Sequence, residues 1–270
     1  MKERSMLNLI KLSIAAGAMA LAVAPTPAAT LKPTIVLVHG AFAGSSSWNG
    51  VVAELTKLGY PVIAAANPLR GVASDGGYVA SLTRSVAGPV ILVGHSYGGA
   101  VISAAANGLP HVKALVFVAA FAPDRGESAL DLTGKFPGST LPPALAAPVK
   151  LEDGGEDLYV QQDKFPHQFA ADVPLAQAQA MAATQRPIKA AALSEAAPSP
   201  AWKTIPSWSI YGTGDLNIPP QAMGFMAERA QARKTVVVKG GSHALMVSHP
   251  REVAALIVDA ARSVDGDTAR

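Results

Sequence analysis

The sequence contains no cysteine among its 270 residues. Disulfide bonds, a thiol nucleophile and cysteine-ligated zinc are therefore excluded. Charged side chains are also scarce, at 15% of the chain, and the formal net charge is only +3. Because there is no basic stripe with interleaved aromatic residues, we expect no nucleic-acid partner.

The first residues have the layout of a secretory signal. Lys2, Arg4 and Lys11 are basic, and an apolar stretch at 12–23 follows, then small residues and prolines. This order is typical of a signal peptide, and the apolar stretch is short for a membrane span. We predict that residues 1–29 are a signal peptide and that the protein is exported, periplasmic or secreted, with no stable membrane insertion after cleavage. An uncleaved membrane anchor is the alternative.

Residues 30–270 have the pattern of one α/β domain. Continuous apolar runs are typical of strands buried on both faces of a parallel sheet, and here they alternate with helical patterns. The predicted strands are at 34–38, 61–66, 90–93, 114–119, 207–211 and 235–238. A final helix is expected at about 250–264. The pattern predicts a mostly parallel, doubly wound sheet.

One long region interrupts this pattern. From 122 to 204 the chain is rich in Pro, Gly, Ala and Gln, with a short helix candidate at 175–184. Irregular insertions of that length are uncommon and usually functional. We therefore predict a core at about 30–121 and 205–264, and a cap at about 122–204 over the site. A loosely held surface loop is the alternative.

The segment at 94–99, GHSYGG, carries the strongest chemical signal. It fits G-x-S-x-G with Ser96 at its centre, directly after the predicted strand at 90–93 and before a helix-like run at 100–107. Strand, glycine-flanked serine and helix are the context of a nucleophile elbow, whose sharp turn exposes the serine hydroxyl at the amino end of a helix. The pattern predicts that Ser96 is a nucleophile.

A serine nucleophile needs a base, and the base needs an acid to orient it. His243 follows the predicted strand at 235–238, at the sheet edge where ligands bind in open α/β folds. Asp215 follows the strand at 207–211, in a loop bounded by glycines and prolines. We predict His243 as the base and Asp215 as the acid. Asp124 is the competing acid, although its arginine and glycine neighbours favour a loop salt bridge or a turn.

Three other histidines lie near these residues. His95 precedes the nucleophile, so we expect its side chain to point away from it. His39 ends the first strand, and we expect it to hydrogen-bond backbone and shape the next loop. His249 directly precedes a proline at a helix start, which favours a capping or surface role.

The negative charge that develops during acyl transfer needs backbone N–H donors. One is expected from Tyr97, the residue after the nucleophile, and the other from the loop at 39–48, HGAFAGSSSW. Donation from the main chain would leave the side chains of Ala41 and Tyr97 to shape the pocket. A glycine-rich connection without a ligand is the alternative for this loop.

Four segments occur in order along the chain: VLVHGAFAGSSSW, VGHSYGGAV, YGTGDLNIPP and GGSHALM. With them the chain resembles the α/β-hydrolase superfamily, and within it the branch of plant methylesterases, the salicylate-binding esterase and hydroxynitrile lyases. The resemblance implies an α/β-hydrolase fold with a cap. It also implies that Ser96 is the nucleophile, His243 the base and Asp215 the acid, with the N–H groups of Ala41 and Tyr97 as oxyanion donors.

Two positions depart from the hydroxynitrile lyases of this branch. Those carry a lysine directly after the catalytic histidine, where this chain has Ala244, and a threonine where it has Gly40. Both differences favour hydrolysis. We therefore expect a serine hydrolase, without cofactor or metal, that cleaves a small, apolar or aromatic carboxylic ester through an acyl-enzyme. The alternatives are a small-ligand-binding protein that retains the pocket, or another chemistry on the same residues, such as a lactonase, C–C hydrolase, perhydrolase or lyase.

Overall fold

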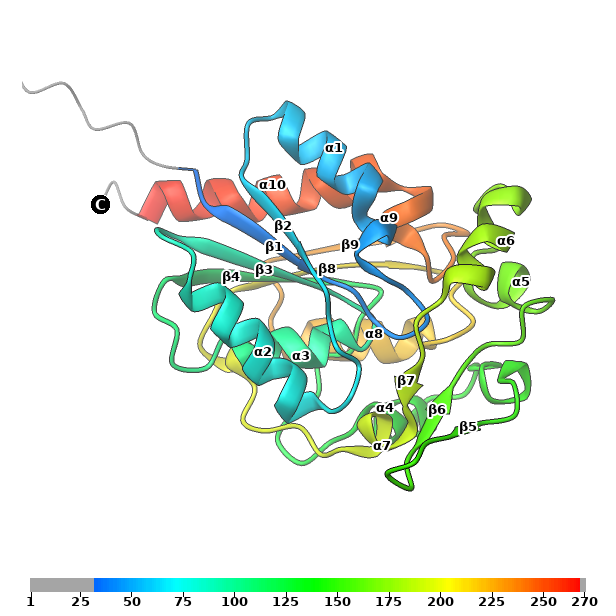
Figure 1. The fold of residues 1–270 in the computed structure, drawn as a ribbon. Helices are drawn as coiled ribbons and strands as arrows, with labels where there is room; N and C mark the ends of the chain where they lie inside the picture. The colour runs from blue at the N-terminus through cyan, green and yellow to red at the C-terminus, as the bar shows by residue number, and fades with distance from the viewer. Residues whose placement is uncertain (1–31, 268–270) are drawn as a thin grey trace, which may run out of the picture. The chain divides into compact units, whose positions relative to one another are not determined.

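The main sheet of the computed structural model, which describes residues 32–267, contains six parallel strands (Figure 1). Their order is β2-β1-β3-β4-β8-β9. The strands are β1 (Thr34–Val38), β2 (Val62–Ala65), β3 (Val90–His95), β4 (Val112–Val118), β8 (Ser207–Gly212) and β9 (Lys234–Val238). The predicted parallel, doubly wound sheet is confirmed. The predicted signal peptide at 1–29 lies outside the described residues.

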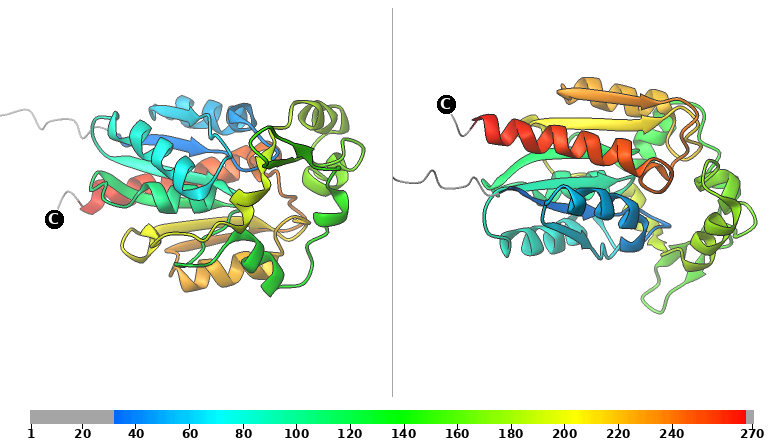
Figure 2. Two further views of the ribbon diagram at one scale, coloured as in Figure 1. Left: turned by 60° about the horizontal axis from the view of Figure 1, so that its bottom comes forward. Right: turned by 90° about the horizontal axis from the view of Figure 1, so that it is seen from above.

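The central strands show why the apolar runs are continuous. Every residue of β3 is buried, and in β4 only Lys113 is exposed. Helices cover both faces of the sheet: α1 (Asn49–Lys57) and α10 (Pro250–Asp267) lie on one face, and α2 (Val72–Arg84), α3 (Gly98–Ala105) and α8 (Pro220–Arg229) on the other (Figures 1 and 2). The strands are therefore shielded from water on both sides.

The strand order puts the loops after β1 and β3 side by side. From β1 the chain goes to β2 on one side and then to β3 on the other. Ligands bind in open α/β sheets at such a reversal, outside the carboxyl ends of the strands. The loop after β1 leads into the short 3-10 helix η1 (Ser45–Trp48), and the loop after β3 contains Ser96.

We call residues 122–204, between β4 and β8, the cap. It contains four helices, α4 (Ala129–Lys135), α5 (Phe165–Phe169), α6 (Leu175–Thr184) and α7 (Ala190–Ser194), with 3-10 turns η2 (Pro142–Ala144) and η3 (Ala201–Lys203). It also contains an antiparallel sheet of β5 (Val149–Lys150), β6 (Glu156–Leu158) and β7 (Ile188–Lys189). Figures 1 and 2 show α5, α6 and the small antiparallel sheet beyond the carboxyl ends of the core strands.

Some element bounds differ from those expected. The strand predicted at 114–119 begins at Val112, and the last helix continues to Asp267. The helix predicted at 175–184 is found with the same bounds. The antiparallel cap sheet was not expected, because strands of two or three residues leave no periodic pattern in a sequence.

Candidate active site

Ser96 occupies a strained turn between β3 and α3. Its φ angle is 55°, in the left-handed region that side-chain-bearing residues rarely adopt. Two glycines permit this turn. A Cβ at Gly94 would lie 2.5 Å from the carbonyl oxygen of Gly98, and a Cβ at Gly98 would lie 2.5 Å from that of Val38. The glycine-flanked serine thus has the geometry of a nucleophile elbow.

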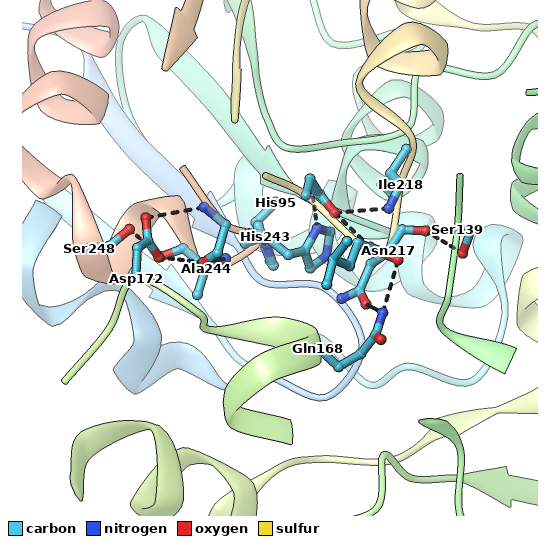
Figure 3. A network of polar contacts seen from close by, with 12 residues as sticks. His95, Ser139, Gln168, Asp172, Asn217, Ile218, His243, Ala244 and Ser248 are labelled. Carbon is cyan, nitrogen blue, oxygen red and sulfur yellow. Dashed lines mark hydrogen bonds and ion pairs between the residues drawn. The ribbon is translucent and has the colours of Figure 1, made fainter. Parts of the chain in front are cut away.

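His243 and Asp215 form a buried pair. His243 lies between β9 and the short helix α9 (Leu245–Ser248), and its Nδ1 is 2.7 Å from Oδ2 of Asp215, which follows β8 (Figure 3). The other carboxylate oxygen of Asp215 accepts hydrogen bonds from the N–H groups of Asn217 at 2.8 Å and Ile218 at 2.9 Å. A carboxylate at Nδ1 favours the tautomer with the proton there, which leaves Nε2 free to accept a proton.

Asp124 lies elsewhere. Its Oδ1 is 2.6 Å from Nζ of Lys203 in a partly exposed ion pair. The hydrogen bond from Lys203 lowers the pKa of the Asp124 carboxyl below its usual value. The structure thus brings Asp215, and not Asp124, to His243.

His95 links the base loop to the elbow. Its Nε2 donates to the carbonyl oxygen of His243 at 3.0 Å, and the centroids of the two rings are 4.7 Å apart. Burial, followed by the nearby His243, holds the pKa of His95 well below its ordinary value, so the ring is neutral. Because His95 directly precedes Ser96, this bond links the His243 loop to the turn that contains Ser96.

The sequence indicated that the His95 side chain points away from the nucleophile but did not indicate its partner. Its partner is 148 positions further along the chain, and no local pattern identifies a contact of that range. His39 behaves as expected: its Nδ1 donates to the carbonyl of Gly40 at 2.9 Å, and burial lowers its pKa to about 4. Nδ1 of His249 lies 3.4 Å from Oδ2 of Asp172, and both side chains are partly buried.

The loop after β1 passes close to the elbow at Gly40. A Cβ at Gly40 would lie 2.6 Å from Cβ of Ser96 and 3.1 Å from the backbone N of Tyr97. The backbone next to Ala41 therefore approaches the serine more closely than any other residue type would permit. This approach puts the backbone N–H groups of Ala41 and Tyr97, the predicted donors, on adjoining segments.

The Tyr97 side chain does not shape a pocket, and that expectation was wrong. The side chain is 1% exposed, and its hydroxyl donates to Oδ2 of Asp75 in α2 at 2.9 Å. Burial and the neighbouring Asp75 carboxylate raise the pKa of Tyr97. The side chain thus anchors the elbow to α2, while the backbone N of Tyr97 lies close to Gly40 in the loop after β1.

The cap supplies residues that the sequence analysis missed. The ring of Phe169 packs edge-on against His243, with centroids 4.9 Å apart, and against Phe42, with centroids 6.5 Å apart. The backbone N–H of Phe42 donates to the carbonyl of Arg186 in the cap at 2.9 Å. Cap residues therefore contact both His243 and the loop after β1.

Two kinds of feature are absent from residues 32–267. No helix in that range has the length and apolar character needed to cross a membrane. No cluster of three or more histidine and carboxylate side chains in the same range is placed to hold a metal ion.

Comparison with known proteins gives the family. The model of the alpha/beta hydrolase family matches residues 35–256. A carbendazim-hydrolysing esterase of Nocardioides sp. is 34% identical over 125 residues, which are 42% of this chain and half the length of that protein.

Solved structures agree with this match. An extracellular alpha/beta-hydrolase from a Paenibacillus species, described as homologous in structure and function to tobacco salicylic acid binding protein 2, is 27% identical. It has a TM-score of 0.69, with 84% of this chain and 98% of that one covered. Polyneuridine aldehyde esterase is 20% identical, with a TM-score of 0.74 and the same coverage, and shares the fold. The resemblance stated from the sequence is confirmed, and the chain belongs to the alpha/beta hydrolase family, with esterases among its relatives.

Proposed function

We propose that the protein is a serine esterase that hydrolyses a small carboxylic ester through an acyl-enzyme. The observation that carries the proposal is the buried pair of His243 and Asp215, 2.7 Å apart, which His95 links to the turn that holds Ser96 at φ 55°. A nucleophile, a base and an orienting acid are the minimum that this chemistry needs. The esterases among the relatives support the same reaction class.

In the first half of the proposed reaction, Nε2 of His243 takes the proton of the Ser96 hydroxyl. Oγ then attacks the ester carbonyl carbon. The backbone N–H groups of Ala41 and Tyr97 stabilise the oxyanion of the tetrahedral intermediate. When this intermediate collapses, His243 gives its proton to the departing alcohol, and the acyl group stays on Ser96.

In the second half, His243 takes a proton from water, which attacks the acyl-enzyme. Collapse of the second intermediate releases the carboxylic acid and returns the proton to Ser96. Asp215 remains ionised throughout and stabilises the positive charge on His243. Every proton movement is assigned to one of this chain's own side chains, so the reaction as proposed requires neither cofactor nor metal.

An apolar or aromatic substrate fits the side chains around the pair. Phe169 lies against His243, and Phe42 lies against Phe169. Ester hydrolysis is favoured over cyanohydrin cleavage, because Ala244 offers no positive charge beside His243. A threonine at Gly40 would also clash, since any Cβ there would lie 2.6 Å from Cβ of Ser96.

The proposal is tested with purified protein and p-nitrophenyl esters of increasing acyl length. A burst of p-nitrophenol equal to the enzyme concentration, and covalent labelling by a fluorophosphonate, are both expected. Ser96→Ala should lose the burst and the label while remaining folded. If the wild-type protein gives neither signal, the chain is not an esterase, and a protein that binds a small ligand in the same pocket becomes the better hypothesis.

We further propose that the protein is exported and that residues 1–29 are removed. The basic, apolar and small-residue order of that segment supports export, as does the extracellular Paenibacillus relative. The mass of the mature protein from culture fluid or periplasm should correspond to a chain that begins near residue 30. A full-length chain found in the cytoplasm would contradict this proposal.

A further inference from the structure

One cap segment contacts both loops of the buried His243–Asp215 pair. Residues 165–173, which we call the clamp segment, comprise α5 and the turn that follows it. The side chains of Gln168 and Asp172 point towards the loops after β8 and β9 (Figure 3). Within residues 32–267, no other segment of the cap hydrogen-bonds to both loops.

Gln168 of the clamp segment holds the acid loop. Its side-chain Nε2 donates to Oδ1 of Asn217 at 2.8 Å and to the carbonyl of Leu216 at 2.9 Å. The backbone N–H of Asn217 in turn donates to Asp215. Gln168 is 5% exposed, so little water competes for these bonds. It therefore fixes the two residues that follow Asp215.

Asp172 of the clamp segment holds the base loop. Its Oδ1 accepts from the hydroxyl of Ser242 at 2.5 Å, and its Oδ2 accepts from the backbone N–H of Ser242 at 3.1 Å. The Ser242 oxygen also accepts from the backbone N–H of Ala244 at 3.3 Å. Through one hydroxyl, Asp172 thus restrains the residues on both sides of His243. Nδ1 of His249 lies 3.4 Å from Oδ2 of the same carboxylate.

Phe169 lies between these two polar residues and closes the arrangement. Its ring meets the His243 ring edge-on, at an interplanar angle of 84°. The imidazole is therefore packed by the cap on one side and by His95 on another. A ring confined in this way keeps one orientation towards its acid.

We propose that the clamp segment positions the acid–base pair, with Gln168 and Asp172 as positioning residues that assemble Asp215 and His243 when the cap docks. Neither residue touches the reacting atoms. The inference rests on the proposed function for its kinetic consequences, but the geometry of the pair is testable without turnover. A displacement of about 1 Å in such a pair costs on the order of 100-fold in rate.

The kinetic test compares three substitutions with the wild-type protein. Asp172→Ala and Gln168→Met should each lower kcat by about 10- to 100-fold, with KM changed by less than about threefold. Asp172→Asn should retain most of the kcat that Asp172→Ala loses. Its amide can still hydrogen-bond to the backbone N–H and to the hydroxyl of Ser242. If Asp172→Ala does not fold, Ser242→Ala takes its place, since it removes only the bridging hydroxyl.

The matched control breaks another bond between cap and core. Oδ1 of Asp157 in β6 is 2.7 Å from Nη1 of Arg70, which lies in the core between β2 and α2. Asp157→Asn should keep kcat within about twofold of the wild type, because it loosens the cap without touching either loop. An equal loss in this control would overturn the proposal in favour of general loosening of the cap.

A spectroscopic readout separates this inference from the proposed function. The proton between Nδ1 of His243 and Asp215 should give a downfield proton NMR signal in the wild type. We expect it to shift or broaden in Asp172→Ala and Gln168→Met, and to stay unchanged in Asp157→Asn. An unchanged signal and kcat in both clamp variants would refute the inference. A wild-type protein without esterase activity would refute only the proposed function, since the NMR comparison would still stand.

Discussion

The core and the cap of this protein differ in the interactions that stabilise each of them. In the core, long parallel strands bond to one another through their backbones, and β3 is buried along its whole length. In the cap, β5 and β7 have two residues each, and side-chain amides add to the backbone pairing. For example, Nε2 of Gln168 donates to the carbonyl of Leu216 and to Oδ1 of Asn217. Nε2 of Gln185 donates to the carbonyls of Val160 and Ala182.

Because of this difference, the core and the cap contribute to the candidate site in different ways. Ser96, Asp215 and His243 all follow core strands, where a rigid backbone fixes their positions. The cap adds side chains that pack and bond around them. Rigid strand ends suit a group that must keep its place within fractions of an ångström, whereas side-chain bonds can be broken and remade as substrate enters.

The largest effect is expected when Asp215, the proposed acid, is changed. Asp215→Asn keeps the shape of the side chain but removes the charge that orients His243 and stabilises its protonated form. We expect kcat for ester hydrolysis to fall by about 10⁴-fold. Asp124→Asn is the control, since Asp124 pairs with Lys203 at the surface, and it should change kcat by less than about twofold. A larger loss for Asp124→Asn would mean that the acid assignment is wrong.

A second prediction tests the close approach of two core loops. Gly40→Ala puts a Cβ 2.6 Å from Cβ of Ser96 and 2.7 Å from the backbone oxygen of His95. Since neither atom can move freely, the loop after β1 must shift, and the oxyanion donors shift with it. We expect kcat to fall by about 100- to 1000-fold.

The control for this prediction lies in the same loop. A Cβ at Gly44 would meet only the flexible side chain of Arg186, at 3.5 Å. Gly44→Ala should therefore keep kcat within about twofold of the wild type. Equal losses in the two variants would show that the loop as a whole, and not its approach to Ser96, is sensitive.

The strands of the core were predictable because each is a continuous apolar run in the sequence. β1, β3 and β8 were found within two residues of their predicted bounds, and even the partly exposed edge strand β9 was found from its three valines. Ser96 was identifiable because an elbow requires glycines around the serine. Asp215 and His243 were identifiable because each follows a core strand, where a ligand site was expected.

The cap was predictable only where it contains a regular helix. α6 was found from its sequence pattern, but the clamp segment was not. Gln168 bonds to a residue 49 positions away, and Asp172 to one 70 positions away. Which glutamine or aspartate acts in this way depends on how the cap docks, and a single sequence does not encode that as a local pattern. The Tyr97 side chain was misjudged for the same reason, since its partner Asp75 lies on another helix.

A third prediction concerns pH and the buried histidines of the core. Burial lowers the pKa of His39 from 6.5 to about 4, and it lowers that of His95 as well. As the pH falls, these two histidines therefore bind protons at a higher pH in the unfolded chain than in the folded protein. The contribution of these histidines to the free energy of unfolding should be complete above about pH 6.5. It should decrease towards pH 4.5, by about 2–3 kcal/mol for His39 alone.

Urea denaturation at several pH values measures this slope. The lowered carboxyl pKa values of Asp124 and Glu127 belong to groups that protonate at lower pH, so they do not dominate this window. His39→Asn keeps a donor for the carbonyl of Gly40 but does not titrate. Its slope between about pH 6.5 and 4.5 should be shallower than that of the wild type. An identical slope would assign the effect to other groups.

The smallest effect is expected where a cap side chain replaces a backbone partner. Oε1 of Gln185 accepts from the N–H of Val160 at 2.9 Å, and its Nε2 donates to the carbonyl of Val160 at 2.9 Å. The amide thus pairs with Val160 as a neighbouring strand would. Gln185→Ala should cost about 1–2 kcal/mol of local stability, and hydrogen exchange at the Val160 amide should quicken by about 10-fold. Amides of β3 should exchange as before, and Gln179→Ala, at an exposed position of α6, should change neither. If β3 also exchanged faster, the cap and the core would unfold as one unit, and the difference between them would be one of bonding alone and not of stability.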